Sequence, residues 1–147
     1  MRVALDTNIL VYAEGFGDVV RRDSTLYLLE RLPAEQIIVP AQVLGELCRV
    51  MNGKAQRSPD MTRSLVLQWA DSFEVADSTW AAFQSALDLT VDHGLRIWDA
   101  LILAVTAENH CRLLLSEDMH HGFTWRGVTV INPYRLPLHP LLAPLLG

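Results

Sequence analysis

The chain has 147 residues, of which 50% are hydrophobic and 20% charged, so it fits one globular domain and excludes a disordered or low-complexity chain. Two cysteines are too few for a disulfide framework, and the longest apolar run, residues 100–105, is too short to cross a bilayer. A formal charge of −5 lacks the basic excess of a general nucleic-acid binder. Because Asp6 interrupts the first apolar stretch, we expect no signal peptide and a soluble, cytoplasmic protein.

Short apolar runs alternate with helical patterns along the chain. In chain order we expect a strand over 2–6, helices over 8–14 and 19–32, a strand over 37–39, helices over 40–52 and 59–72, a short strand over 73–76, helices over 79–93 and 97–109, and strands over 112–115 and 128–131. Pro40 and Pro59 are typical first residues of helices, and Gly53 and Gly94 are typical helix ends. Strands alternating with helices predict an α/β protein with a parallel sheet and helices on both faces.

Acidic residues fall where a parallel sheet presents its chemistry. Asp6 ends the first strand, and Glu117 and Asp118 follow the strand over 112–115. Ligand sites in open α/β sheets lie at the carboxyl ends of strands, so we expect Asp6 and Asp118 to meet although 112 residues separate them. The alternative for each acid is a turn former or helix cap.

Two further acids lie on predicted helices. Glu46 lies at the edge of the apolar stripe of the helix over 40–52, where a carboxylate is paired, solvated in a cleft or bound to metal. Pairing with Arg49 is its structural alternative. Asp99 lies in the first turn of the most apolar helix, where it stabilises the helix N-terminus, faces the same cleft as Asp6, or does both.

Three or four carboxylates in one cleft would repel one another and resist ionisation unless a cation neutralised them. Oxygen ligands without Cys or His favour hard ions such as Mg²⁺ or Mn²⁺. Such ions bind phosphates and activate water for in-line displacement at phosphorus. The residues therefore predict a metal-dependent phosphoryl-transfer enzyme.

Other acidic α/β proteins are disfavoured at single positions. A haloacid-dehalogenase-type phosphatase needs a second Asp two residues after the first, where this chain has Asn8. A response-regulator receiver needs a Lys after a late strand, and Lys54 is the only lysine. A dinucleotide-binding domain needs a Gly-rich turn after the first strand, which Thr7 and Asn8 do not supply.

Four segments in order resemble the motifs of PIN-domain ribonucleases, in particular the VapC-type toxins of bacterial toxin–antitoxin pairs. They are residues 4–12 (ALDTNILVY), 40–47 (PAQVLGEL), 97–102 (IWDALI) and 115–119 (LSEDM), followed by Gly122 and by Asn132 and Pro133. The resemblance covers nearly the whole chain. It implies a three-layer α/β/α, PIN-like fold, with a central, mostly parallel sheet of about five strands and the acids clustered at its C-terminal edge.

The resemblance also implies roles for site residues. The catalytic, metal-binding set would be Asp6, Glu46, Asp99 and Asp118. The polar side chains that orient those carboxylates would be Thr7, Asn8 and Ser116. Glu117 is a fifth acid beside Asp118, and we expect it to be solvated rather than to contact the metal through water.

A protein of this kind would hydrolyse single-stranded RNA with Mg²⁺ or Mn²⁺, leaving a 5′-phosphate and a 3′-hydroxyl, and the RNA that it binds would be single-stranded or structured. The resemblance further implies a cognate antitoxin and a homodimer. A PIN-fold RNA-binding or scaffold module without cleavage is the alternative, which the presence of all four acids disfavours. We expect residues 1–134 to form the nuclease domain and the Leu/Pro-rich residues 135–147 to form an irregular tail, for which the resemblance implies no role.

Aromatic and histidine side chains are expected to be structural. We expect Trp69, Trp80 and Trp98 to pack in the core. Trp125 follows the acidic motif, and we expect it to pack as well rather than to stack on an RNA base. The adjacent histidines at 120–121 lie in a predicted loop and are expected to be solvated.

Overall fold

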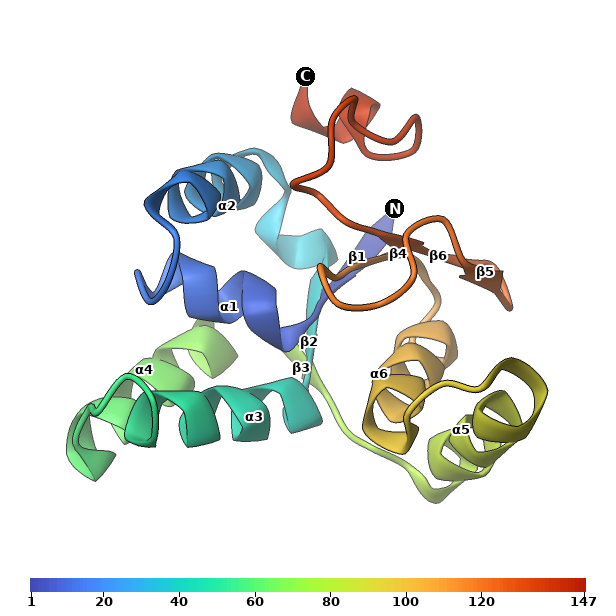
Figure 1. Ribbon diagram of the computed structural model, residues 1–147, viewed down its shortest axis with the longest axis horizontal. Helices are drawn as coiled ribbons and strands as arrows, with labels where there is room; N and C mark the ends of the chain where they lie inside the picture. The colour runs from blue at the N-terminus through green and yellow to red at the C-terminus, as the bar shows by residue number, and fades with distance from the viewer.

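The computed structural model describes all of residues 1–147, which fold around a six-stranded sheet of order β3-β2-β1-β4-β6-β5 (Figure 1). The strands are β1 (Arg2–Leu5), β2 (Ile37–Pro40), β3 (Glu74–Ala76), β4 (Cys111–Leu115), β5 (Thr124–Trp125) and β6 (Val128–Ile131). All neighbouring strands are parallel except the pair β5 and β6. The predicted mostly parallel sheet is confirmed, and β5 adds a short antiparallel edge that the sequence did not predict.

Six α-helices flank the sheet in a three-layer α/β/α arrangement. They are α1 (Thr7–Ala13), α2 (Val19–Arg31), α3 (Ala41–Asn52), α4 (Pro59–Ser72), α5 (Trp80–His93) and α6 (Ile97–Glu108). Two short 3₁₀ helices are η1 (Ala34–Gln36) and η2 (Ala143–Leu146). Figure 1 shows α1 to α4 on one side of the sheet and α5 and α6 on the other.

Side chains at the helix ends explain where several helices begin. The Ser58 side chain accepts a hydrogen bond from the Met61 N–H ahead of Pro59, and Thr79 accepts one from the Ala82 N–H. These bonds satisfy backbone donors that the first turn of a helix leaves free. Gly94 ends α5 with a φ of 69°, a left-handed conformation that glycine adopts without a steric penalty.

The hydrophobic core consists of one cluster of 35 buried residues around the central strands. Helix α6 contributes a continuous buried segment, residues 100–106, which confirms the expectation that it lies in the middle of the fold. Strands β1 and β4 pair in parallel, so both end at the same edge of the sheet. The residues that directly follow these two strands are Asp6 and Ser116.

Residues 135–147 pack against the fold. Leu142 is fully buried, and η2 lies against α2. The segment is anchored from its start, because the Tyr134 hydroxyl lies 2.6 Å from the Thr25 hydroxyl on α2. Figure 1 shows this C-terminal segment beside α2. The expected irregular conformation therefore applies to most of the segment, but η2 is helical.

No helix of this protein combines the length and apolar character needed to span a lipid bilayer.

Candidate active site

Asp6 is the buried centre of the site, between the end of β1 and the start of α1. Its Oδ1 accepts a hydrogen bond of 2.7 Å from the Thr7 N–H, which makes Asp6 the N-cap of α1. Its Oδ2 accepts a bond of 2.6 Å from the Ser116 hydroxyl, which directly follows β4. Burial raises the pKa of Asp6 to about 6, although both hydrogen bonds favour the charged form.

The three other predicted acids are linked to this centre through their charges: Asp99 and Glu46 act on Asp6, and Asp118 acts on Asp99. After burial and its two hydrogen bonds, the charges of Asp99 and Glu46 also raise the pKa of Asp6. Burial, and then the charge of Glu46, raises the pKa of Asp99; Arg96 opposes these effects, and Asp118 adds to them. The fold thus gathers Asp6, Glu46, Asp99 and Asp118 at one edge of the sheet.

Glu46 is held by neutral side chains. The Thr7 hydroxyl donates a hydrogen bond to Glu46 Oε2, and Gln42 Nε2 donates to Oε1 at 2.9 Å. The same Gln42 nitrogen donates to the Trp98 carbonyl oxygen at 3.0 Å, which ties α3 to the start of α6. Glu46 does not pair with Arg49. Sequence analysis missed Gln42, although it lies one helical turn before Glu46 on the same face.

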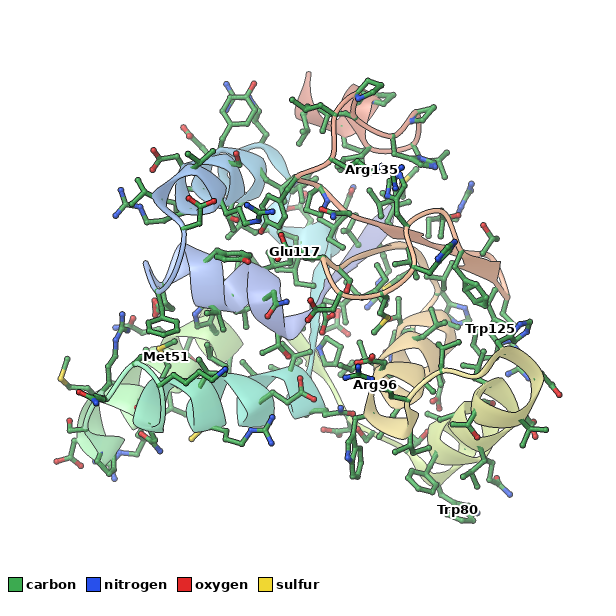
Figure 2. The ribbon with its side chains drawn as sticks, in the orientation of Figure 1. Met51, Trp80, Arg96, Glu117, Trp125 and Arg135 are labelled. Atoms are coloured by element: carbon green, nitrogen blue, oxygen red, sulfur yellow. The ribbon has the colours of Figure 1, made fainter.

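Asp118 and Glu117 have different environments although they are adjacent. The exposed Asp118 accepts a hydrogen bond of 2.6 Å from Asn8 Nδ2. Glu117 is largely buried, accepts a bond of 2.6 Å from the Tyr12 hydroxyl and forms an ion pair with Arg21. The expectation that Glu117 is solvated was therefore wrong. Figure 2 shows Glu117 above α1, and Arg96 beside the start of α6.

The chemistry of these donors fits a hard divalent cation. All four carboxylates supply oxygen, and two of them have raised pKa values because burial and neighbouring acids oppose their charge. The hydrogen-bond partners of Glu46 and Asp118 are neutral groups, so these partners leave the charges of both carboxylates available to a cation. In this structure, however, no group of three or more Asp, Glu, His or Cys side chains is placed closely enough to hold a metal ion.

Two cavities flank the carboxylates. One, of about 400 Å³, is lined among others by Arg96, Asp99, Asp118 and His120. The other, of about 360 Å³, is lined by Gln42, Gly45, Glu46, Arg49 and Trp98. The site is therefore open on both sides of Asp99, and each cavity contains one arginine beside the acids.

Two tryptophans contradict the expectation of core packing. Trp80 is 69% exposed and Trp98 is 58% exposed. Trp69 and Trp125 are partly buried and pack against the core, as expected. His121 is also not simply solvated, because its Nδ1 accepts a hydrogen bond of 2.9 Å from the Asn132 N–H.

Residues 3–121 match the family model of the PIN domain. The chain belongs to the PIN-domain family. The matched region contains all four acids of the site, and it ends before the segment that packs against α2. No curated protein matches the sequence.

Solved structures share the fold of this PIN domain. A toxin–antitoxin complex from Klebsiella pneumoniae aligns with a TM-score of 0.68 and 20% identity, over 91% of this chain and 99% of that one. VapC20 of Mycobacterium tuberculosis, described as a toxin that cleaves the sarcin–ricin loop, aligns with a TM-score of 0.65 and 18% identity, over 79% and 89%. FitAcB from Neisseria gonorrhoeae aligns with a TM-score of 0.62 and 19% identity, over 91% and 99%.

Proposed function

We propose that this PIN domain is a Mg²⁺- or Mn²⁺-dependent endoribonuclease that hydrolyses single-stranded RNA in the cytoplasm. The observation that supports it most is the buried Asp6 carboxylate, whose pKa is raised further by the nearby charges of Asp99 and Glu46. None of the four carboxylates forms an ion pair, and a fold that gathers like charges around a buried one is suited to a cation. We assign this activity to residues 1–134, with residues 135–147 as a packed extension.

Each residue of the site has a role that follows from its contacts. Asp6, Glu46, Asp99 and Asp118 would hold the cation, which supplies charge neutralisation and the activation of water. The Ser116 hydroxyl and the Thr7 N–H fix both oxygens of Asp6. Thr7 and Gln42 orient Glu46, and Asn8 orients Asp118. Glu117 would link the segment after β4 to α1 and α2 through Tyr12 and Arg21, and Arg21 neutralises its charge.

We further propose that the protein is the toxin of a type II toxin–antitoxin pair, with a cognate antitoxin and a homodimeric assembly. The likeness to a toxin–antitoxin complex from Klebsiella pneumoniae and to VapC20 supports this assignment. An antitoxin arginine placed against the four carboxylates would pair with them and exclude the cation.

Cleavage of a labelled single-stranded RNA by the purified protein tests the enzymatic proposal. We expect cleavage with Mg²⁺ or Mn²⁺, none with EDTA, and a 5′-phosphate on the product. Asp6→Asn is expected to lose at least about 100-fold in activity, because a neutral amide binds the cation poorly. Asp77→Asn is the control: Asp77 follows β3 at the same sheet edge but is exposed, so its loss should leave cleavage unchanged.

Equal cleavage by wild type and Asp6→Asn would show a contaminating nuclease or a misplaced site. Binding of RNA without cleavage would favour the alternative of a PIN-fold RNA-binding or scaffold module. The toxin role has its own test, which is expression without a partner. Wild type should arrest growth and Asp99→Asn should not, whereas harmless expression of a folded protein that cleaves RNA would contradict the toxin role.

A further inference from the structure

Helix α6 is buried along most of its length, yet it exposes its largest side chain. Residues 100–106 are all buried, whereas Trp98 is 58% exposed in the first turn. An exposed indole contributes little to the core, so packing does not account for a tryptophan here. Trp98 directly precedes Asp99, one of the four carboxylates. The exposed indole therefore stands at the edge of the candidate active site.

This indole forms one wall of the 360 Å³ cavity, and α3 forms the other. The α3 residues in the cavity share one face of that helix, because they are spaced by three or four positions. They are Gln42, Gly45, Glu46 and Arg49. Gln42 donates to Glu46 and to the Trp98 carbonyl, so the two walls are held in register with a carboxylate of the site.

Gly45 and Arg49 give this cavity space and charge. Glycine destabilises the middle of a helix relative to alanine, but a Cβ at Gly45 would meet no atom within 4 Å, so local sterics do not require glycine there. Arg49 is exposed and takes part in no ion pair. The cavity thus combines an open floor, an aromatic face and a free guanidinium beside a carboxylate.

We infer that this cavity is a nucleobase subsite. The base next to the cleaved phosphodiester stacks on Trp98, Arg49 contacts the adjacent backbone phosphate, and Gly45 leaves room for the base. An aromatic platform and a cation are the two elements with which proteins bind single-stranded nucleic acid. Only an unpaired base can lie flat on an indole, so the subsite also selects single-stranded substrate. The inference rests on the proposed ribonuclease function.

The kinetic test compares two exposed tryptophans. Trp98→Ala is expected to raise KM for a short single-stranded RNA roughly tenfold, the scale of one lost base–aromatic stack, with a smaller change in kcat. Trp98→Phe should recover most of the loss. Trp80→Ala is the matched control, because Trp80 is 69% exposed on α5 and lies far from Arg96 and Glu117 (Figure 2). Equal KM values for wild type and Trp98→Ala would overturn the inference.

A substrate change identifies the base that is bound. Removing the base next to the cleaved bond should weaken wild type about as much as Trp98→Ala does, and should cost Trp98→Ala little more. If removing the base and replacing Trp98 weaken the enzyme by fully additive amounts, the base does not stack on Trp98 and the inference is overturned. Gly45→Leu should raise KM without lowering the melting temperature, since it fills the cavity floor with a good helix former. An unchanged KM in this variant would also count against the subsite.

Anisotropy of a labelled oligonucleotide separates this inference from the proposed function. If wild type binds the oligonucleotide without cleaving it, and Trp98→Ala binds it more weakly, the ribonuclease is refuted and the subsite is kept. If wild type cleaves RNA, and Trp98→Ala has the same KM and the same affinity for the oligonucleotide, the subsite is refuted and the ribonuclease is kept. A wild type that neither binds nor cleaves RNA would refute both.

Discussion

Ser116 and Asp6 are 110 residues apart in sequence and are joined by a buried hydrogen bond of 2.6 Å between the Ser116 hydroxyl and Asp6 Oδ2. The same hydroxyl oxygen accepts a bond of 3.2 Å from the Met119 N–H. Ser116 therefore connects the central carboxylate to the loop that carries Asp118. The bond also favours the charged form of Asp6 and so lowers its pKa against the effect of burial.

Ser116→Ala should reduce cleavage while the protein stays folded. Losses of about 10- to 100-fold are typical when a residue that orients a metal-binding group is removed. Because the hydrogen bond lowers the pKa of Asp6, its loss should move the acidic limb of the pH–rate profile to higher pH. Profiles of kcat/KM for the two proteins measure both effects. An unshifted acidic limb would show that Ser116 does not act through Asp6.

Asp6→Asn should change how stability depends on pH in the metal-free protein. The pKa of Asp6 is about 6 in the folded state, above its ordinary value of 3.8, so the folded state binds the proton more tightly. The tighter binding of this proton stabilises the folded state. The stabilisation is fully present below pH 4 and is lost as the pH rises through 6. Wild type should therefore lose up to about 3 kcal/mol relative to Asp6→Asn between pH 4 and 7.

Denaturant unfolding in EDTA at both pH values measures that difference. If the free energy of unfolding depends on pH in the same way in wild type and in Asp6→Asn, the raised pKa of Asp6 is contradicted. Mg²⁺ at pH 7 should stabilise wild type more than the variant, because a ligand that binds only the folded state adds to its stability.

Asp99→Asn should raise the melting temperature of the metal-free protein at neutral pH while abolishing cleavage. Burial and the charge of Glu46 both disfavour a charged Asp99, so an amide of similar shape relieves that cost. Added Mg²⁺ should stabilise wild type and stabilise Asp99→Asn less. Thermal melts with EDTA and with Mg²⁺ measure these shifts.

Asp60→Asn is the control for Asp99, because Asp60 is an exposed acid in the first turn of α4. It should lose the favourable interaction with the helix dipole, worth about 0.3–1 kcal/mol, together with its exposed ion pair with Arg63. If Asp99→Asn lowers the melting temperature as Asp60→Asn does, Asp99 is a helix-dipole partner and the repulsion is absent.

Glu117→Gln should lower stability more than activity. Its carboxylate pairs with Arg21 and accepts the Tyr12 hydroxyl, so it does not need a cation. Loss of this partly exposed ion pair is expected to cost about 1 kcal/mol of unfolding free energy. Asp118→Asn is the neighbouring control and should lose cleavage instead. A loss of cleavage in Glu117→Gln as large as in Asp118→Asn would place Glu117 among the cation ligands.

Local sequence patterns predicted the elements that carry the site. The strand predicted over 2–6 and the nearly all-apolar helix predicted over 97–109 each lie within one residue of their observed bounds, Arg2–Leu5 and Ile97–Glu108. The rule that parallel strands present ligands at their carboxyl ends correctly placed Asp6 and Asp118 after the same ends of two paired strands, β1 and β4. The hairpin of β5 and β6 was missed because β5 has only two residues, too few for a period of two to be visible.

Other features depend on contacts that no local pattern contains. Glu117 is buried by Tyr12 and Arg21, which lie 105 and 96 residues away in sequence. Trp98 is a large aromatic residue of the kind usually found in the core, but it lies in the first turn of α6 and lines the open cavity beside α3. The exposure of an aromatic side chain depends on which helix packs beside it. The tertiary fold decides that, so a local sequence pattern does not predict it.

The order of the strands has a consequence for the newly made chain on the ribosome. Asp6, Glu46 and Asp99 have all been synthesised once residue 99 is added, but β1 pairs with β4, whose last residue is Leu115. Until residues 111–118 have been added, Asp6 lacks the Ser116 hydroxyl and the site lacks Asp118. Pairing over such a sequence separation is slow compared with local helix formation. Translation therefore finishes most of the polypeptide before the four carboxylates can act together.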